Sequence, residues 1–316
     1  MEEYDVVIIG AGPAGLSAAI ELSKHKSIKC LLLDKNKFLD VSTRSWTTFN
    51  SLVKKYHCLD CVKYRLNQVM FRSLRGSAYT VDLGKDFLWV LDEKKFKKKL
   101  LEKVKIEKTE KTAVIKIIRE KNRIKLNTNS QDIMTKILID ASGDAGLCRR
   151  MMNLEIDTYG YVKCRILTGC NFVGDTTPWG ILLTKKKRNE TFIAAWAEPY
   201  SKSRVLIATE SYAHKKVNPK VNDLILNKFM QDKDFKKIFK RAMILREWDT
   251  KYPLTPLEKV AYDNIMLVGD AGAQSTPLMM EGIRPGMFEG KIAARIAASA
   301  IKRKDYSFTI LKKYQE

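Results

Sequence analysis

Three glycines near the N-terminus have the spacing of a diphosphate-binding loop, in a stretch that reads VVIIGAGPAGLSAAI. The β-branched run Tyr4 to Ile9 is typical of a short buried strand, and Leu16 to Lys24 has helical spacing. Between them, Gly10 permits a tight turn, Gly12 lets a pyrophosphate approach the backbone, and Gly15 lets helix and strand pack closely. The free N–H groups and the dipole at the start of such a helix favour a bound anion.

A carboxylate follows the next expected strand at the spacing that a dinucleotide needs. Ile28 to Leu33 reads as a second buried strand, and Asp34 lies 19 residues after Gly15. An acid at this position can accept hydrogen bonds from ribose hydroxyls. Together these features predict a Rossmann-like dinucleotide-binding unit, and they leave NAD and FAD as alternatives.

A second group of glycine and aspartate residues lies in the C-terminal third of the chain. Asn264 to Val268 reads as a short buried strand, and Gly269 and Asp270 follow it with a turn and a carboxylate that could hold ribityl or ribose hydroxyls. A polar loop then leads to a long helix expected from Gly282 to about Ile301, whose small-residue face suits packing on a sheet. If its N-terminus points at a flavin ring, it would stabilise the reduced flavin anion.

The cysteines give a weaker signal. The chain has six, and Cys58 and Cys61 form a CxxC pair preceded by His57. A zinc site would need a second ligand pair at suitable spacing, and Cys164 with Cys170 matches poorly. We therefore expect no metal and ordinary reduced thiols.

Three segments together resemble a known family of flavoproteins. The N-terminal GxGxxG, ILIDASGDAG at residues 137–146, and GDAGAQSTPLMMEGIRPGMFEGKIAA are similar, in the same order, to the FAD motifs of proteins with a p-hydroxybenzoate-hydroxylase-like fold. Within that fold, the chain resembles the geranylgeranyl reductases and the related lycopene cyclases. The resemblance implies that the cofactor is FAD.

The resemblance also implies a set of FAD-binding residues. In the closing motif Gly269, Asp270, Pro277, Leu278, Gly282 and Ile283 match, whereas Met279, Met280 and Glu281 replace the small residues usual there. Arg44 resembles the arginine that these proteins place near the ribityl and phosphates. The expected FAD-binding residues are Gly10, Gly12, Pro13, Ala14, Gly15, Asp34, Lys35, Arg44, Val114, Gly143, Gly269, Asp270, Pro277, Gly282 and Ile283.

The middle of the chain carries the signal for a substrate. The segment AAWAEP, residues 194–199, resembles the YxWxFP motif with which geranylgeranyl reductases line an isoprenoid-binding cavity. Trp196 and Pro199 match and are the expected substrate-binding residues, while Ala194 replaces the tyrosine and Glu198 the phenylalanine. The resemblance implies reduction of C=C bonds in geranylgeranyl chains of membrane lipids or their precursors. No residue is identified as the proton donor.

Three other functions stay open. RVLIATESY, residues 204–212, is similar to the lycopene cyclase segment with an acidic pair, but Ala208 and Thr209 occupy the matching positions and Glu210 lies beyond them. An FAD-dependent monooxygenase is a further alternative, although Ser142 stands where hydroxylases usually carry aspartate and no WxWxIP-type halogenase motif is found. A non-enzymatic FAD-binding protein is the last.

The coarse pattern predicts an α/β (α+β) fold with two domains. We expect a discontinuous, Rossmann-like FAD-binding domain from residues 1–60, 92–152 and 255–316. Residues 96–104 read as a helix, 114–118 and 123–126 as a hairpin, and 136–139 as a buried strand. Residues 61–91 and 153–254, which include alternating segments such as 204–212, would form an antiparallel-sheet substrate domain.

Composition limits the location and the partners of the protein. At 316 residues and 45% hydrophobic residues, the chain can bury a large core, and its net charge is +22. We expect no nucleic acid, because the lysines are scattered and no recognition-helix pattern occurs. An anionic membrane surface remains a partner, beside an apolar substrate and an electron donor, either NAD(P)H or a ferredoxin. The longest apolar run is broken by glycine and proline and lacks preceding basic residues, so we expect a cytoplasmic protein, peripheral on the membrane.

Overall fold

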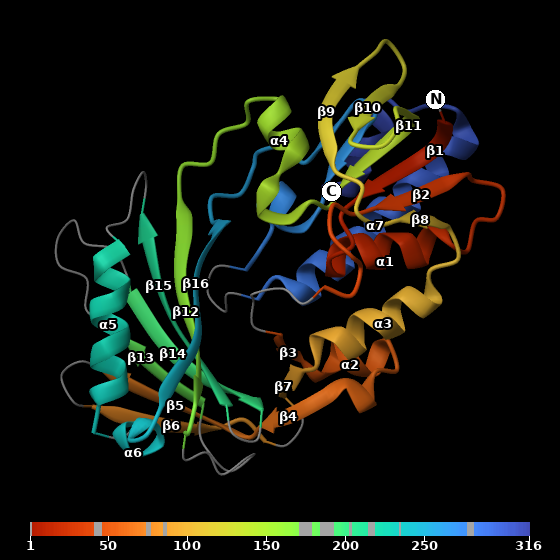
Figure 1. Cartoon of the computed structure of the whole chain (residues 1–316). Coiled ribbons are helices and arrows are strands. Elements are labelled where there is room, and N and C mark those ends of the chain that lie inside the picture. Colours follow the sequence, from red (N-terminus) through yellow and green to blue (C-terminus); the bar gives the residue numbers. More distant parts are fainter. Residues whose placement is uncertain are drawn as a thin grey trace. The chain divides into compact units, whose positions relative to one another are not determined.

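The computed structural model describes residues 2–40, 46–73, 77–84, 87–170, 179–183, 193–201, 204–213, 219–233, 235–276 and 281–316. The chain divides into two compact units, each assembled from separate stretches of sequence (Figure 1). The first unit comprises Met1–Val41, Lys94–Ile156 and Pro253–Glu316, and the second comprises Ser42–Glu93 and Asp157–Tyr252.

The first unit is built on a mixed sheet whose central strands are parallel. The strands run in the order β17-β18-β11-β1-β2-β8, and β10 pairs with both β11 and β9. Their bounds are β1 Glu2–Ile9, β2 Cys30–Leu33, β8 Glu107–Thr109, β9 Val114–Arg119, β10 Ile124–Thr128, β11 Ile133–Asp140, β17 Ala261–Tyr262 and β18 Ile265–Leu267. Strand β2, residues 6–9 of β1 and most of β11 are buried and aliphatic, as expected of a parallel sheet covered on both faces.

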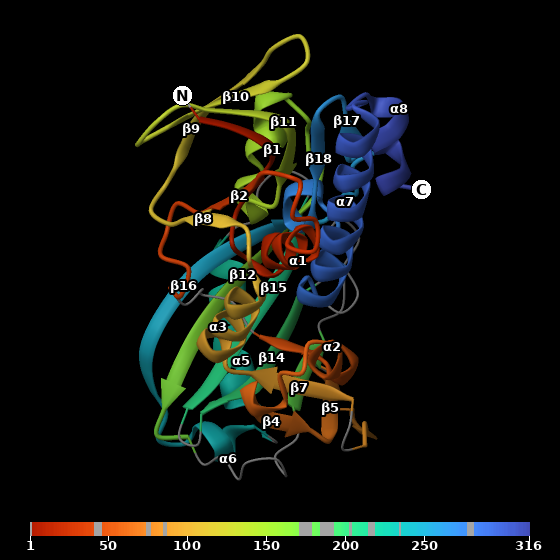
Figure 2. The same cartoon turned by 90° about the vertical axis from the view of Figure 1, so that its right-hand side faces the viewer.

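Two long helices of this unit pack against each other through small residues. Helix α1 (Pro13–Leu22) and helix α7 (Ile283–Arg303) lie side by side in Figure 1 and Figure 2. A Cβ atom added at Gly290 would lie 2.2 Å from the Ala14 carbonyl oxygen, so only glycine permits this approach. The unit also contains α3 Glu93–Lys103, η2 Gly143–Ala145, α4 Leu147–Met151, η4 Gly269–Gly272, α8 Phe308–Leu311 and η5 Lys312–Tyr314.

The second unit contains a larger and a smaller sheet. The larger runs in the order β16-β12-β15-β14-β13-β5-β6. The pairs β12–β15, β15–β14, β14–β13 and β5–β6 are antiparallel, and β13 pairs with β5 in parallel. Its strands are β5 Gln68–Ser73, β6 Ala78–Asp82, β12 Tyr159–Thr168, β13 Trp179–Leu183, β14 Ile193–Ser201, β15 Arg204–Ala213 and β16 Met243–Pro253. The smaller sheet joins β3 Thr47–Phe49, β7 Leu88–Leu91 and β4 Val62–Leu66, and α2 Asn50–Lys55 and η1 Leu59–Cys61 connect its strands.

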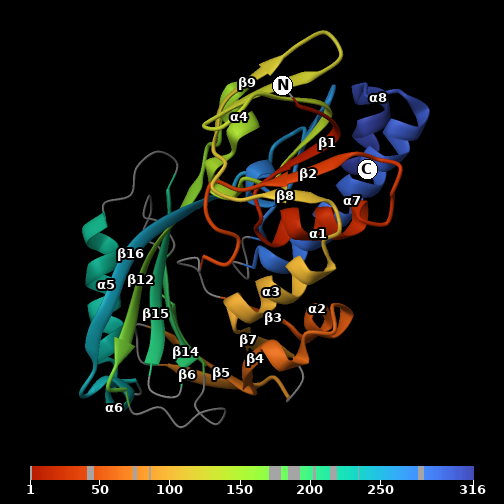
Figure 3. The ribbon, with the colours of Figure 1, turned by 45° about the vertical axis from the view of Figure 1, so that its right-hand side comes forward.

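One face of the larger sheet is covered by helix α5 (Pro219–Gln231) and the short helix α6 (Lys236–Phe239), as Figure 3 shows. Alternate residues of the central strands, such as Ala195 and Ile207, form a buried apolar cluster with Leu226 and Phe229 of α5. Since neighbouring residues of a strand point to opposite faces, the residues between them point to the second face of the sheet.

The observed elements agree with most of the expected ones, and the exceptions have a clear origin. The helix expected at residues 96–104, the hairpin at 114–126 and the strand at 204–212 are confirmed as α3, the pair β9 and β10, and β15. Residues 42–60, expected in the first domain, cluster with the second unit, because β3 pairs with β7. Within the described residues, no helix combines the length and apolar character required to cross a membrane.

Candidate functional site

The parallel strands of the first unit end in register at one edge of the sheet. Ile9 pairs with Leu33 on one side and with Asp140 on the other, and Asp140 pairs with Leu267. The loops that follow these four strands therefore begin side by side, although they are far apart in sequence. Ligands of open α/β sheets bind outside this carboxyl edge.

The glycine-rich loop after β1 is shaped by contacts within the protein at two of its glycines but not at the third. Gly10 has φ +103°, and a Cβ atom there would lie 2.3 Å from the Ala141 carbonyl oxygen. A Cβ atom on Gly15 would lie 1.8 Å from the Gly10 carbonyl oxygen. At Gly12 the same atom would meet nothing within 4 Å. Gly12 therefore borders open space at the start of α1, where Pro13 occupies the first helical position.

Asp34 holds the glycine-rich loop from the end of β2. Its Oδ2 atom accepts a hydrogen bond from the Ala11 N–H at 2.7 Å, and its Oδ1 atom accepts one from the Asn36 N–H at 2.8 Å. A carboxylate has about four acceptor positions, so both oxygens could still accept hydroxyl donors. The acid thus combines a structural role with the capacity to bind ribose.

The loop after β11 is fixed by buried polar groups. The Asp140 carboxylate is fully buried and accepts hydrogen bonds from the Ser142 N–H at 3.0 Å and the Cys148 N–H at 2.7 Å. Gly143 has φ +68° and borders open space. Arg149, which is 3% exposed, donates to the backbone oxygens of Asp144 at 3.2 Å, Asp270 at 3.0 Å and Ala271 at 3.4 Å. Arg149 therefore joins the loop after β11 to the loop after β18.

The loop after β18 is anchored by helix α7. Gly269 adopts φ +62°, and its N–H donates to Glu289 Oε2 at 2.9 Å. Burial, together with the nearby Asp270 charge, raises the Glu289 pKa to about 7, although the Gly269 hydrogen bond opposes this shift. The Ser275 hydroxyl donates to Asp270 Oδ1.

A second polar group lies beneath this loop. The Tyr314 hydroxyl donates to the Leu267 carbonyl oxygen at 2.9 Å. The Gln274 amide, placed with its nitrogen toward its acceptors, donates to the Tyr314 oxygen at 2.9 Å and to Glu289 Oε2 at 3.2 Å. Burial raises the Tyr314 pKa well above its usual range. The C-terminal segment η5 thus supports the loop that carries Gly269 and Asp270.

Helix α7 begins at Ile283, after Gly282, and its first turn already holds a carboxylate. Glu281 is buried, and its Oε1 atom accepts a hydrogen bond from the Arg284 N–H at 2.7 Å. A negative charge at a helix N-terminus satisfies the same N–H groups that would otherwise face a ligand. We expected this N-terminus to face a flavin, but the Glu281 carboxylate already binds there. Glu281 is one of the three residues that depart from the family motif.

Of the remaining expected FAD-binding residues, the structure describes Lys35 and Val114 but not Arg44 and Pro277. Lys35 is exposed beside Asp34. Val114, partly buried, follows a segment in which the Thr112 N–H donates to the Asp34 carbonyl oxygen at 2.8 Å. Val114 therefore lies two residues along the chain from Thr112, the residue that is bonded to Asp34 at the end of β2. Arg44 and Pro277 lie outside the described residues.

The two expected substrate-binding residues lie on opposite sides of strand β14. Trp196 is buried between Ala195 and Ala197, which face α5, so its side chain is on the second face of the sheet. Pro199 shares the alternation of Ala195 and Ala197 and falls on the α5 side. The Glu198 carboxylate accepts a hydrogen bond from the Thr47 hydroxyl at 2.7 Å and is 4% exposed.

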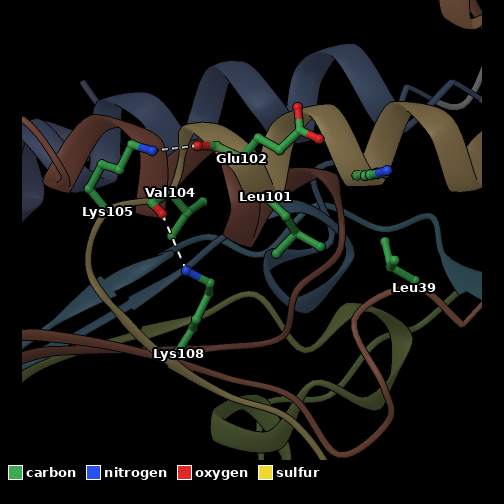
Figure 4. A pocket seen from close by; sticks show the side chains of 7 residues that line it. Leu39, Leu101, Glu102, Val104, Lys105 and Lys108 are labelled. Carbon is green, nitrogen blue, oxygen red and sulfur yellow. Dashed lines mark hydrogen bonds between the residues drawn. The ribbon is translucent and has the colours of Figure 1, made fainter.

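A pocket of about 530 Å³ in the first unit has a basic rim (Figure 4). It is lined by Leu39, Lys98, Leu101, Glu102, Val104, Lys105 and Lys108. Lys105 donates to the Glu102 carbonyl oxygen at 2.8 Å and Lys108 to the Val104 carbonyl oxygen at 3.4 Å, so two of its ammonium groups bind the end of α3. This pocket is lined by residues that the sequence motifs do not single out.

The sequence motifs missed Asp140, Arg149, Glu289 and Tyr314. Asp140 lies in the ILIDASGDAG motif, and its position at the end of a buried strand indicated a structural carboxylate. Arg149 is next to the exposed Arg150 in a chain rich in basic residues, so nothing in the sequence distinguishes it from a surface arginine. Glu289 and Tyr314 are remote in sequence from the strands they support, and only the fold brings them there.

The geometry fits an adenine dinucleotide with respect to its diphosphate and ribose. The open space at Gly12 admits a diphosphate at the N-terminus of α1, Asp34 retains acceptor positions, and Gly143 borders open space. In the described part of the chain, no group of three or more histidine, cysteine or acidic residues is arranged to hold a metal ion.

Comparison with known proteins agrees with the motifs. Residues 7–159 match the family described as pyridine nucleotide-disulphide oxidoreductase. The chain is 26% identical to a digeranylgeranylglycerophospholipid reductase of Methanosarcina acetivorans, with 99% of this chain and 79% of that protein covered. It is also 26% identical to one of Methanocaldococcus jannaschii, with 99% and 81% covered.

A solved structure confirms the fold class. The structure of a geranylgeranyl bacteriochlorophyll reductase-like protein from Thermoplasma acidophilum has a TM-score of 0.85 at 18% identity, covering 100% of this chain and 83% of that one. A flavin-dependent brominase has a TM-score of 0.80 at 20% identity, covering 99% and 83%. The expected resemblance is thus confirmed: the chain is an FAD-dependent oxidoreductase, similar over its whole length to the digeranylgeranylglycerophospholipid reductases.

Proposed function

We propose that this protein uses FAD to reduce C=C bonds in the isoprenoid chains of membrane lipids or of their precursors. The observation that carries the proposal is the full-length similarity to digeranylgeranylglycerophospholipid reductases, in a chain whose three cofactor loops begin together at one sheet edge. Bound FAD would supply the hydride, and the protein must supply binding, orientation and a proton.

The first unit holds the cofactor in this proposal. Gly10, Gly12, Gly15, Pro13 and Ala14 form the loop and helix start that receive the diphosphate. Asp34 binds the ribose, with Lys35 next to it and Val114 nearby, and Arg44, which lies outside the described residues, is kept in the set as a prediction from the sequence. Gly143, Gly269, Asp270, Pro277, Gly282 and Ile283 complete the FAD-binding set, and Arg149 and Glu289 position their loops from behind.

The second unit takes the apolar chain of the substrate. Trp196 lies buried on the face of the sheet that α5 does not cover, and its ring would be the apolar wall against which the chain packs. Isoprenoid chains are bound by apolar area rather than by hydrogen bonds, and a dry surface also favours proton and hydride transfer to an alkene. Pro199 faces the other side of the sheet, so it would shape the backbone of strand β14 and would not contact the substrate.

The electron donor in this proposal is NAD(P)H or a ferredoxin, and the protein acts in the cytoplasm. The net charge of +22 favours contact with an anionic membrane surface, where lipid substrates reside. Such binding should weaken as salt rises, because exposed charges are screened within about 8–10 Å at physiological ionic strength. Sedimentation with anionic and with neutral vesicles measures this, and equal binding to both would remove the membrane contact from the proposal.

Product analysis tests the proposed reaction. The FAD-loaded protein is reduced with dithionite without oxygen and incubated with digeranylgeranyl glycerophospholipid or with lycopene. Mass spectrometry should show a gain of two hydrogens per double bond in the lipid. Lycopene isomerised at unchanged mass would instead indicate cyclase chemistry, and an unchanged lipid would contradict the proposal.

A further inference from the structure

A fully buried carboxyl group lies in the middle of the larger sheet. Glu210 is on strand β15 and is 0% exposed. Neither of its carboxyl oxygens has a hydrogen bond of normal geometry. An isolated ionised carboxylate in such a place would cost far more than a neutral one, so such groups take up a proton. Accordingly, burial raises the Glu210 pKa well above its usual range, although the nearby Tyr212 hydroxyl opposes the shift.

Glu210 lies on the same face of the sheet as Trp196. In the antiparallel pair of β14 and β15, Trp196 is opposite Ala208 and Ala194 is opposite Glu210. Residues directly opposite each other point to the same face, and so do residues two apart on one strand. Glu210 is therefore a diagonal neighbour of Trp196. On the opposite face of β15, Ile207 and Thr209 face helix α5.

The residues around Glu210 on this face are small or apolar. Ala194 is opposite on β14, Ala208 precedes it on its own strand, and Val162 is opposite on β12. A Cβ atom on Gly160 would come within 2.7 Å of both Glu210 Oε1 and the Tyr252 ring, so the carboxyl group and this ring meet above that glycine.

The titratable groups near Glu210 on this face are Tyr212 of the same strand, Tyr252 of β16, Cys164 of β12 and Glu198 of β14. Strand alternation also places two exposed arginines on this face, Arg204 at the start of β15 and Arg246 of β16. The ammonium of Lys163 and the guanidinium of Arg165 belong to the α5 face, where they pair with Asp223 and Glu247. Arg204 is six residues from Glu210 along β15, and Arg246 is six residues from Tyr252 along β16, so neither guanidinium is a neighbour of the Glu210 carboxyl group.

We propose that Glu210 is the acid that donates a proton to the double bond of the substrate lying against the Trp196 face. This inference rests on the proposed function. Ala194, where the family motif has a tyrosine, leaves the position opposite Glu210 without a bulky side chain. The face thus places the buried Glu210 carboxyl group beside apolar side chains, as protonation of an alkene in a dry site requires.

The step balances with the chemistry of an FAD-dependent reductase. The O–H bond of the Glu210 carboxyl breaks, and its proton forms a C–H bond at one alkene carbon. The other carbon takes the hydride, with its electron pair, that the reduced cofactor supplies. The alkene is reduced, FAD is oxidised, and the Glu210 carboxylate is neutralised again by a proton from water.

The test compares Glu210→Gln with wild type and with Thr209→Val. Glutamine keeps the size of the side chain but has no acidic proton. Thr209 is a buried neighbour on the same strand that faces α5, so its replacement controls for disturbance of the sheet. Glu210→Gln should bind FAD and the lipid as wild type does, with turnover reduced about 100-fold or more. Thr209→Val should keep wild-type turnover.

Infrared difference spectroscopy gives a measurement that does not depend on turnover. Wild-type protein at pH 7 should show the carbonyl band of a protonated carboxyl group that Glu210→Gln lacks, and lipid binding should shift that band. A retained acid in Glu210→Asp should restore part of the activity. The turnover rate of wild type should fall with rising pH as Glu210 ionises. The slower turnover rate of Glu210→Gln should not change over the same pH range.

Two results separate this inference from the proposed function. If wild type reduces the lipid and Glu210→Gln does so equally fast, or if the carboxyl band is absent from wild type, Glu210 is not the proton donor while the reductase function stands. If wild-type protein does not reduce the lipid at all, the proposed function is wrong and the role of Glu210 fails with it.

Discussion

Gly12 and Gly15 differ in what a methyl group at each position would meet. At Gly12 it would enter open space beside the start of α1, whereas at Gly15 it would collide with the Gly10 carbonyl oxygen at 1.8 Å. Gly12 also has an extended backbone, φ −74° and ψ −177°, that alanine adopts without strain. Within this loop, the fold therefore requires glycine at position 15, whereas only a bound ligand would require it at position 12.

We predict that Gly12→Ala weakens FAD binding without destabilising the FAD-free protein. The added methyl would occupy the space that the diphosphate needs, at a cost of about 1–3 kcal/mol, or roughly 5- to 150-fold in affinity. Gly15→Ala should instead lower the melting temperature of the FAD-free protein. Fluorescence titration with FAD and thermal unfolding measure the two effects. A Gly12→Ala protein that binds FAD normally would show that the diphosphate lies elsewhere.

Glu289 should make the stability of the first unit depend on pH. Its pKa rises from the ordinary 4.5 to about 7, so between these values the folded protein holds a proton that the unfolded chain has lost. The stabilisation is complete below about pH 4.5 and is lost as pH rises through 7, with a total on the order of 3 kcal/mol.

Urea unfolding of the FAD-free protein at pH 5 and at pH 8 measures this contribution. Glu289→Gln, which stays neutral, should lose less stability than wild type over the same interval. If both proteins lose the same amount, Glu289 does not carry a proton at pH 5 in the folded state.

At the scale of elements, the ends of β1, β2, β11 and β18 determine the site. Each strand was recognisable from its apolar run, and each loop from its glycine or aspartate, so the sequence predicted the parts of the site and their chemistry. Their common edge follows from the parallel register, which a motif does not contain but a Rossmann-like fold implies.

Other features of the elements could not be predicted. Residues 61–91 were expected in the antiparallel sheet of the substrate domain, but Leu88 and Val90 pair with β3 and β4 in a separate sheet. The sequence of a short apolar strand does not specify which strand it pairs with. Residues 42–60 join the second unit for the same reason. The carboxylate of Glu281 at the start of α7 depends on a backbone turn that only the structure shows.

Arg149 should hold two cofactor loops together. Its guanidinium donates to backbone oxygens of both loops, and its loss would leave these buried acceptors unsatisfied, at about 1–3 kcal/mol for each. We predict that Arg149→Met lowers both the melting temperature and the affinity for FAD. Arg149→Lys should restore only part of each, since lysine lacks the planar fork.

The neighbouring Arg150 provides a matched control. It is exposed, so Arg150→Met removes the same charge at the next position without opening the loops. Equal effects of Arg149→Met and Arg150→Met on melting temperature and FAD affinity would contradict the positioning role.

At the scale of the whole molecule, the proposed function divides cofactor binding and substrate binding between the two units. The first has the loops and sheet edge of a dinucleotide-binding fold, and the second has a sheet face with Trp196 and Glu210. The composition of each unit explains why cofactor binding was easier to predict than the substrate. A diphosphate and a ribose demand glycines and an acid at fixed spacing, whereas an isoprenoid chain demands only apolar area, which many sequences provide.

The measurement that tests the central claim most directly is the reoxidation of reduced FAD by the lipid. Wild-type protein, loaded with FAD and reduced by dithionite without oxygen, is mixed with digeranylgeranyl glycerophospholipid while the flavin absorbance is followed. We predict that the oxidised flavin spectrum returns with one FAD reoxidised for each double bond reduced in the product. A flavin that stays reduced in the presence of excess lipid, and regains its oxidised spectrum only when oxygen is admitted, would contradict the account.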